Sequence, residues 1–451
     1  MRLSPLPRNV DHQPRLLPRP DPTRGLPISE CRQLAHELLP FLETHLRFPR
    51  PEAALYSSGE CLAVPLLADL KNSSPEGAAR EAHLLLQFRR GEGSREIPSS
   101  DTALRAVHTL SPERLHRDLQ GVLDAQIALA REEGCFTSEE PLILAGDCHD
   151  IPTFHRKHPR KVAKKPRASK AFALAVRGPE KGGTTYFHRH LTLYTTRGVP
   201  LTVAVRPRLP LDELHLEMRT GLDEAERRVG RKADLLLYDG GAFGTPVLGM
   251  LQERGSPFIV RAPQHKRIAE ILRIREQQGL TSFALRNYTI LATTARSGDP
   301  GVTVTLVGVS RKLLESVGID LPKAEERTKW FTFATNLSPE PGESDTEFAL
   351  SVFLLYSERW DVETSYRQIS DALGFTHALD YGVRLLLWFL AVFLTNLWAF
   401  QRHRTGQEWK LEELLDYLRA GLLLLGDATE ERQEVPLEKR VQVDAGGVGP
   451  L

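Results

Sequence analysis

Short apolar runs, separated by polar and glycine-containing segments, mark the middle of this 451-residue chain. Two of them, residues 142–145 and 235–238, have the length and composition of buried β-strands. Residues 170–206 alternate between apolar and polar positions, which predicts two or three antiparallel strands. Helices are predicted over residues 211–229 and 264–277. The centre of the chain therefore combines predicted strands with predicted helices.

The two ends of the chain follow other patterns. Residues 1–27 hold seven prolines and five arginines, which predicts a disordered arm. Residues 28–137 have helical spacing in short pieces, with the Ser111–Pro112 pair as an N-cap and first-turn signal. Residues 403–451 contain one amphipathic helix over 409–425 and a charged tail that we expect to be loose.

One run, residues 385–394, is apolar without a polar break and invites comparison with a membrane span. A span needs about 20 residues, so we predict a buried core helix here and no membrane partner. The four cysteines lack a metal-binding spacing, and nothing at the N-terminus resembles a signal peptide. Charged residues at 26% and hydrophobic residues at 41% are globular values. Together these features predict a soluble cytoplasmic protein.

Two aspartates each follow a predicted strand. Asp147 comes where the run 142–145 leaves the core, and Asp239 comes directly after residues 235–238. A Gly-Gly pair then opens a tight turn after Asp239. A carboxylate at such a strand end is held on rigid backbone and faces solvent and ligand. The alternative for each residue is the role of a turn former or helix cap.

A third acidic residue belongs to a polar stripe further along the chain. Tyr356, Arg359 and Glu363 stand at i, i+3 and i+7, so one helix would present them on one face. By itself such a stripe is also typical of a solvated helix. Asp147, Asp239 and Glu363 together supply three carboxylates, which bind hard divalent cations. Two such ions stabilise the attacking and leaving oxygens of a phosphoryl displacement, which is nuclease or polynucleotidyl-transfer chemistry.

With these residues in this order, the chain resembles a DDE transposase of a prokaryotic insertion sequence, in the group with the Tyr-x2-Arg-x3-Glu-x6-Lys signature. The resemblance covers residues 142–400. Further shared motifs lie, in family order, at residues 146–152, 181–194, 239–243, 258–263, 330–336 and 384–398.

The resemblance implies an α/β fold with an RNase H-like mixed sheet and flanking helices. The catalytic core would be formed by residues 138–243 and 348–402, and residues 244–347 would form a β-rich insertion between the second Asp and the Glu. Residues 28–137 would form a helical, DNA-binding N-terminal region.

The resemblance also implies the chemistry of the site. Asp147, Asp239 and Glu363 would be the catalytic residues and would bind two Mg²⁺ (or Mn²⁺) ions. The enzyme would cleave double-stranded DNA at transposon ends and transfer the strands into target DNA. Because it joins two ends, we expect a homodimer on DNA, associated with the nucleoid in the cytoplasm.

DNA contacts are predicted from two parts of the chain. Tyr356 and Arg359 would position a phosphate, and Arg367, one turn after Glu363, would assist. The net charge of +1 hides a basic run over residues 155–170, which has eight Lys or Arg and no acidic residue. Such a run either binds DNA phosphates with release of counterions or forms a solvated loop. The contact residues predicted in this run are Arg156, Lys161, Lys164 and Lys165.

The chain departs from the family pattern at two positions. Ser370 stands where the family has the signature Lys, and Gly240 stands where it often has Arg. Both departures would weaken DNA handling and leave the metal ligands intact. Two alternatives stay open: an RNase H-like metal-dependent nuclease, and a domesticated or inactive DNA-binding copy. Cys148 lacks the partners of a nucleophile, and we expect His149 to make a structural hydrogen bond.

Overall fold

The computed structural model describes residues 28–431, except for several short segments. The predicted disordered arm and the basic residues Arg156, Lys161, Lys164 and Lys165 lie outside the described residues. The segments outside the description are 1–27, 51–53, 91–96, 154–173, 182, 210–212, 292–300, 322–324, 326, 377, 379 and 432–451.

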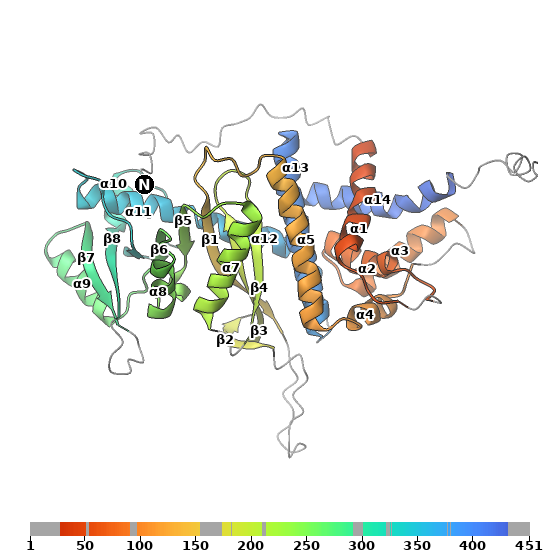
Figure 1. Cartoon of the computed structure of the whole chain (residues 1–451), viewed down its shortest axis with the longest axis horizontal. Helices are drawn as coiled ribbons and strands as arrows, with labels where there is room; N and C mark the ends of the chain where they lie inside the picture. Colours follow the sequence, from red (N-terminus) through yellow and green to blue (C-terminus); the bar gives the residue numbers. More distant parts are fainter. Residues whose placement is uncertain are drawn as a thin grey trace, which may run out of the picture.

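A nine-stranded mixed sheet forms the centre of the molecule (Figure 1). Its strand order is β2-β3-β1-β5-β6-β9-β8-β7, and β4 also pairs with β3. Helices flank the sheet, so the predicted RNase H-like α/β fold is confirmed. The strands are β1 (Ile143–Pro152), β2 (Val176–Lys181), β3 (Thr184–Thr195), β4 (Thr202–Arg208), β5 (Leu235–Tyr238), β6 (Phe258–Arg261), β7 (Ser282–Ile290), β8 (Val302–Ser310) and β9 (Trp330–Thr335).

The middle of the sheet is built from the two runs that the sequence marks as buried strands. β1 and β5 pair in parallel, and β5 pairs in parallel with β6. On the other side of β1, β3 pairs antiparallel with β1, and β4 and β2 pair antiparallel with β3, as predicted for residues 170–206. All four residues of β5 are buried. Such a continuous apolar strand is expected where both faces of a sheet are covered.

The insertion between Asp239 and Glu363 is rich in strands, as predicted. β7, β8 and β9 form an antiparallel group, and β9 pairs antiparallel with β6. The insertion therefore continues the central sheet rather than forming a sheet of its own. β6, which lies within the predicted range 244–347, pairs with the core strand β5. The exact domain boundaries stay predictions.

Helices form the region before β1, in the short pieces that the sequence predicts. Ser111 caps α5, because its side chain accepts a hydrogen bond from the Arg114 N–H at 3.2 Å. α1–α4 gather with α14 at one end of the molecule, and β7 and β8 lie at the other (Figure 1). The helices are α1 (Ile28–His45), α2 (Ser58–Leu70), α3 (Pro75–Arg90), α4 (Ser100–His108), α5 (Pro112–Glu132), α7 (Leu214–Val229), α8 (Thr245–Glu253), α9 (Lys266–Gln277), α10 (Arg311–Ser316), α11 (Asp345–Ser357), α12 (Trp360–Ala372), α13 (Tyr381–Thr405) and α14 (Leu411–Glu431).

The long helix α13 confirms the buried core helix predicted over 385–394. Among the described residues it is the one helix long and apolar enough to cross a membrane, and 94% of its apolar window is buried inside the protein. It packs against α12, α5 and α2. Asn396 in its interior exchanges hydrogen bonds with both backbone groups of Thr202, at 2.8 and 2.9 Å. This residue therefore ties the helix to the start of β4.

Candidate active site

Three polar side chains stand in a row across the neighbouring strands β1, β5 and β6, at the level where β5 and β6 end. Asp147 lies inside β1, which continues to Pro152 through its pairing with β3, so the prediction that the strand ends before Asp147 is wrong. In the register of the sheet, Gly146 pairs with Tyr238, and Tyr238 pairs with Val260. The next residue in each strand direction is Asp147, Asp239 or Arg261. Since neighbouring strands lie about 4.7–4.9 Å apart, these three residues are neighbours.

The same three side chains project from one face of the sheet. Side chains two residues apart in a strand share a face. Ala145, Leu237 and Ile259 all belong to the apolar cluster that includes Val352 and Phe353 of α11. Asp147, Asp239 and Arg261 are two residues further on, and Asp239 still has extended backbone. Both aspartates therefore face the side of the sheet that α11 covers.

Arg359 joins the first aspartate to the glutamate. The Arg359 Nη1 donates a hydrogen bond to Asp147 Oδ2 at 3.0 Å, and its Nη2 lies 3.5 Å from Glu363 Oε1. Its Nε donates to the Tyr356 hydroxyl at 3.0 Å. Asp147 and Glu363, distant in the sequence, thus lie on two sides of one guanidinium.

The helix that was expected to carry Tyr356, Arg359 and Glu363 is not continuous, so that part of the prediction is wrong. α11 ends at Ser357, and α12 begins at Trp360. α11 packs against β7 and β8, whereas α12 packs against α13 and β1. The break lets the two helices follow different parts of the sheet, and Arg359 at the break points into the site.

The pKa of Asp147 depends on its burial and on the charged side chains beside it. Burial and the nearby charge of Asp239 raise the pKa of Asp147 to about 6, although Arg359 acts in the opposite direction. Asp147 Oδ1 accepts a hydrogen bond from the Cys148 N–H at 2.7 Å, and Asp239 Oδ1 accepts one from the Gly241 N–H at 3.0 Å. Asp239 therefore caps the short 3-10 turn after β5, as the turn-former alternative expects, while it also faces Asp147.

The predicted phosphate contacts differ in their access to solvent. Tyr356 is 2% exposed and packs against Phe333, and Arg359 is 5% exposed. In this arrangement Arg359 contacts Asp147 and Glu363, and the Tyr356 hydroxyl contacts Arg359. Arg367 is exposed on α12, one turn after Glu363. Ser370 is exposed as well, and its hydroxyl donates to the Tyr366 carbonyl at 2.7 Å. The DNA contacts of these residues stay predictions.

Cys148 and His149, the two residues after Asp147, are packed inside the protein. Burial raises the pKa of the Cys148 thiol to about 11, so at neutral pH it is protonated and unreactive. His149 stacks on Trp388 with ring centroids 4.3 Å apart, and burial lowers its pKa to about 4. A neutral, stacked imidazole supports a packing role for His149.

Arg261 is the residue at this site that sequence reasoning did not select. Its guanidinium forms a two-pronged ion pair with Glu325, with Nη2 2.8 Å from Oε2. The charges of Tyr356 and Arg359 both affect its pKa, so it lies near them. The sequence could have identified it, because Arg261 directly follows the apolar run 258–260 just as Asp239 directly follows residues 235–238.

The three carboxylates suit a divalent metal ion by their chemistry. Carboxylate oxygens are hard ligands of the kind that Mg²⁺ and Mn²⁺ prefer. Among the described residues, however, no group of three or more His, Cys, Asp and Glu side chains is close enough to hold an ion. The Arg359 guanidinium, in contact with Asp147 and Glu363, supplies positive charge between them in this arrangement.

Comparisons with known proteins place the chain in a family. The family model described as "Transposase DDE domain" matches residues 140–394, a segment that includes Asp147, Asp239 and Glu363. A cryo-EM structure of a piggyBac transposase synaptic complex with hairpin DNA is similar to the chain, with a TM-score of 0.49 and 14% sequence identity over 92% of this chain and 83% of that chain. No curated protein sequence matches the chain.

Proposed function

Because the chain belongs to the transposase DDE domain family, whose model matches more than half of its length, we propose that Asp147, Asp239 and Glu363 are its catalytic residues. As a member of this family the protein is a transposase, an enzyme that cleaves DNA and transfers the strands. The observation that carries the assignment is the register of β1 and β5. It brings Asp147 and Asp239 to neighbouring positions on adjacent strands, on the face where Arg359 connects Asp147 to Glu363.

Members of this family use divalent metal ions, and we propose two Mg²⁺ or Mn²⁺ ions on these three carboxylates. When bound, such ions lower the pKa of a water molecule and stabilise the charge on the phosphodiester oxygens. The protein's contribution is to hold the three metal-ligating carboxylates in place. The middle of β1 fixes Asp147, the end of β5 fixes Asp239, and the start of α12 presents Glu363.

The role of Arg359 follows from its contacts. A buried guanidinium between two carboxylates offsets their mutual repulsion and keeps both oriented. Tyr356 in turn holds Arg359 through its hydroxyl. We propose that this pair positions the carboxylates before the metal ions bind, and that Arg359 lies near the scissile phosphate when DNA is bound.

The wider assembly is also part of the proposal. The substrates would be the double-stranded ends of a transposon and a target duplex, held by a homodimer in the cytoplasm in association with the nucleoid. The helical region before β1 and the exposed Arg367 would contribute to DNA binding. The basic residues Arg156, Lys161, Lys164 and Lys165 remain predicted contacts, since they lie outside the described residues.

Asp239→Asn and Glu363→Gln test the catalytic assignment. Each removes one negative charge at nearly constant volume, so we expect cleavage and strand transfer to be lost while DNA binding persists. The assays are cleavage of labelled duplexes from the DNA flanking the coding frame in Mg²⁺ and a gel shift on the same duplexes. Calorimetric titration with Mn²⁺ measures metal binding directly, and it should weaken in both variants.

Asp371→Asn is the matched control, because Asp371 is an exposed carboxylate on the same helix as Glu363. It should keep wild-type cleavage and Mn²⁺ binding. Retained cleavage in Asp239→Asn would overturn the assignment. Cleavage without any strand transfer in the wild-type protein would instead favour the metal-dependent nuclease, and no cleavage in the wild-type protein would favour an inactive copy.

A further inference from the structure

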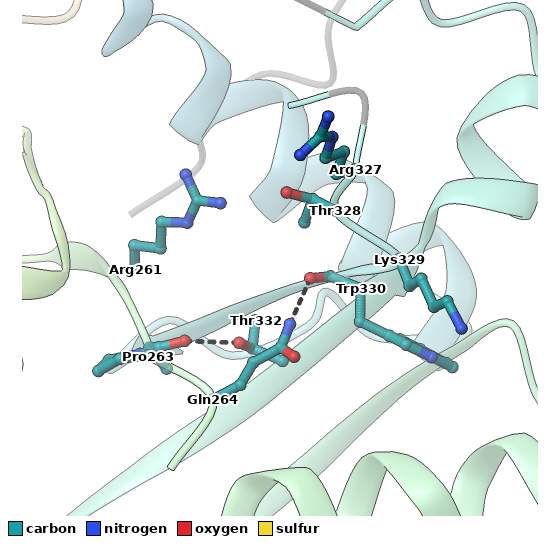
Figure 2. A pocket seen from close by; sticks show the side chains of 9 residues that line it. Arg261, Pro263, Gln264, Arg327, Thr328, Lys329, Trp330 and Thr332 are labelled. Atoms are coloured by element: carbon teal, nitrogen blue, oxygen red, sulfur yellow. Dashed lines mark hydrogen bonds between the residues drawn. The ribbon is translucent and has the colours of Figure 1, made fainter. Parts of the chain in front are cut away.

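A polar pocket of about 510 Å³ opens beside the catalytic row. It lies between the end of β6 and the segment that leads into β9 (Figure 2). Arg261 and Gln264 line it from one side, and Arg327, Lys329 and Thr332 line it from the other. Its volume falls within the range of small-molecule sites.

The pocket is continuous with the catalytic site through Arg261. This residue stands next to Asp239 in the register and on the same face of the sheet. The turn after Asp239 also touches the wall of the pocket. A side-chain carbon on Gly240 would lie 3.7 Å from the Arg261 carbonyl oxygen and 3.8 Å from Pro263 Cδ. The pocket therefore adjoins the end of β5, which carries Asp239.

Of the three cationic side chains that line the pocket, one is paired with a carboxylate and two are not paired among the described residues. Arg261 is paired with Glu325, whose carboxylate also accepts the Thr328 hydroxyl at 2.7 Å. Arg327 and Lys329 are exposed, and neither has an acidic partner within the described part of the chain. Two uncompensated positive charges thus face one pocket, which favours an anionic ligand.

The neutral groups of the pocket restrict the chemical class of the ligand further. Gln264 donates its amide hydrogen to the Trp330 carbonyl at 2.8 Å, and Thr332 donates its hydroxyl to the Ala262 carbonyl at 2.6 Å, as Figure 2 shows. Trp330 is only 6% exposed, so its ring offers little surface on which a base could stack. The groups of the pocket that remain available to a ligand are its cations. They suit a phosphate better than a base.

We propose that this pocket binds a backbone phosphate of the DNA strand close to the cleaved bond, with Arg327 and Lys329 as its ligands. The inference rests on the proposed function, because it takes DNA as the substrate. The contact is electrostatic and independent of base sequence. It holds the strand in line with Asp239 and so positions the scissile phosphate.

The salt dependence of DNA binding tests the proposal. Each phosphate contact contributes about 0.9 to the slope of log affinity against log salt concentration. The variant with both Lys329→Ala and Arg327→Ala should lower the slope by about 0.9, because both side chains contact the same phosphate, and Lys329→Ala alone should lower it by part of that amount. Lys232→Ala removes the same charge from an exposed loop before β5, at the opposite end of the parallel strands from the pocket, and should leave the slope unchanged.

A neutral phosphate analogue locates the contact. Single methylphosphonate groups placed near the cleaved bond of the same duplexes should weaken wild-type binding at one position, and that loss should disappear in the double variant. Additive losses at every position would overturn the inference, as would an unchanged slope in Lys329→Ala. If Asp239→Asn abolishes cleavage while Lys329→Ala binds normally, only this inference fails. Retained cleavage in Asp239→Asn would be a failure of the proposed function.

Discussion

At the scale of single residues, Arg359 is a buried cation whose charge is met by carboxylates rather than by water. Removing such a group from solvent costs several kcal/mol, which only close partners can offset. Asp147, Glu363 and the Tyr356 hydroxyl are those partners. The same contacts make Arg359 a substitute for the positive charge that metal ions would bring.

Replacing Arg359 with Met keeps most of the volume and removes the charge. The metal-free variant should lose about 2–3 kcal/mol of unfolding free energy, because Asp147 loses a charged hydrogen-bond donor. Added Mn²⁺ should stabilise this variant more than the wild-type protein, since the ions then supply the missing charge. Urea unfolding at several Mn²⁺ concentrations measures both effects. Arg367→Met is the exposed control on α12, and an equal Mn²⁺ effect in all three proteins would contradict this role.

Asp147 should make stability depend on pH. Its pKa in the folded protein is raised to about 6, above that of the unfolded chain, so the folded state binds the proton more tightly. Stability contributed by the protonated carboxyl group is therefore lost as pH rises from about 4 to about 6. Metal-free Asp147→Asn should be more stable than the wild-type protein by about 2–3 kcal/mol at pH 8, with a smaller difference near pH 4.

Thermal unfolding in EDTA across this pH range measures the difference. Asp371→Asn, which changes an exposed carboxylate, should show no such dependence. A stabilisation by Asp147→Asn that increases toward acid pH would contradict the raised pKa.

At the scale of elements, the contact between β1 and β5 sets the spacing of the two aspartates. Gly146, which precedes Asp147, lies against the buried ring of Tyr238, which precedes Asp239. A side-chain carbon on Gly146 would come within 1.9 Å of Tyr238 Cε1. The absence of a side chain at this one position therefore allows the two strands to approach.

Gly146→Ala should force β1 and β5 apart. Overpacking of this kind costs about 1–3 kcal/mol. Cleavage should fall further, by about 100-fold, because a displacement of about 1 Å separates the metal ligands. Urea unfolding and the cleavage assay measure the two effects. Gly249→Ala in α8 is the control, since its added carbon meets Val302 at an ordinary 3.6 Å. Wild-type cleavage in Gly146→Ala would show that the strand spacing is not critical.

At the scale of the whole molecule, a net charge of +1 conceals separate acidic and basic regions. Asp147 and Asp239 lie on the adjacent strands β1 and β5, and the exposed cations Arg327 and Lys329 line a pocket together with Arg261. The helical N-terminal region lies at the opposite end of the sheet from β7 and β8 (Figure 1). A long duplex that touches both ends would cross the catalytic row between them.

Joining two DNA ends requires two active sites, so we expect two copies of the chain in the complex with DNA. Mass photometry should show a twofold increase in the protein content of the particle when end-containing duplexes are added. An unrelated duplex of the same length serves as the control. A single copy on end-containing DNA that still performs strand transfer would contradict the expected homodimer.

The sequence by itself determined the apolar start of β1, the strand 235–238 with Asp239 after it, and the core helix α13. These features depend on local composition and periodicity, which are readable along a chain. The sequence did not determine the end of β1, because residues 147–152 extend the strand only through their pairing with β3. The tertiary structure decided which strands and helices are neighbours, and therefore which side chains meet. The parallel register brought Asp147 and Asp239 together, and packing against different parts of the sheet broke the helix before Glu363.

Burial was likewise decided only by the fold. Tyr356 and Arg359 have the residue types of surface DNA contacts, yet the cover of α11 over the sheet leaves them 2% and 5% exposed. Arg261 became part of the site because β6 pairs with β5, a contact between segments that no local pattern specifies. Hydrophobic spacing defines which face of an element is buried, whereas strand register and helix packing determine which polar groups meet at its edge.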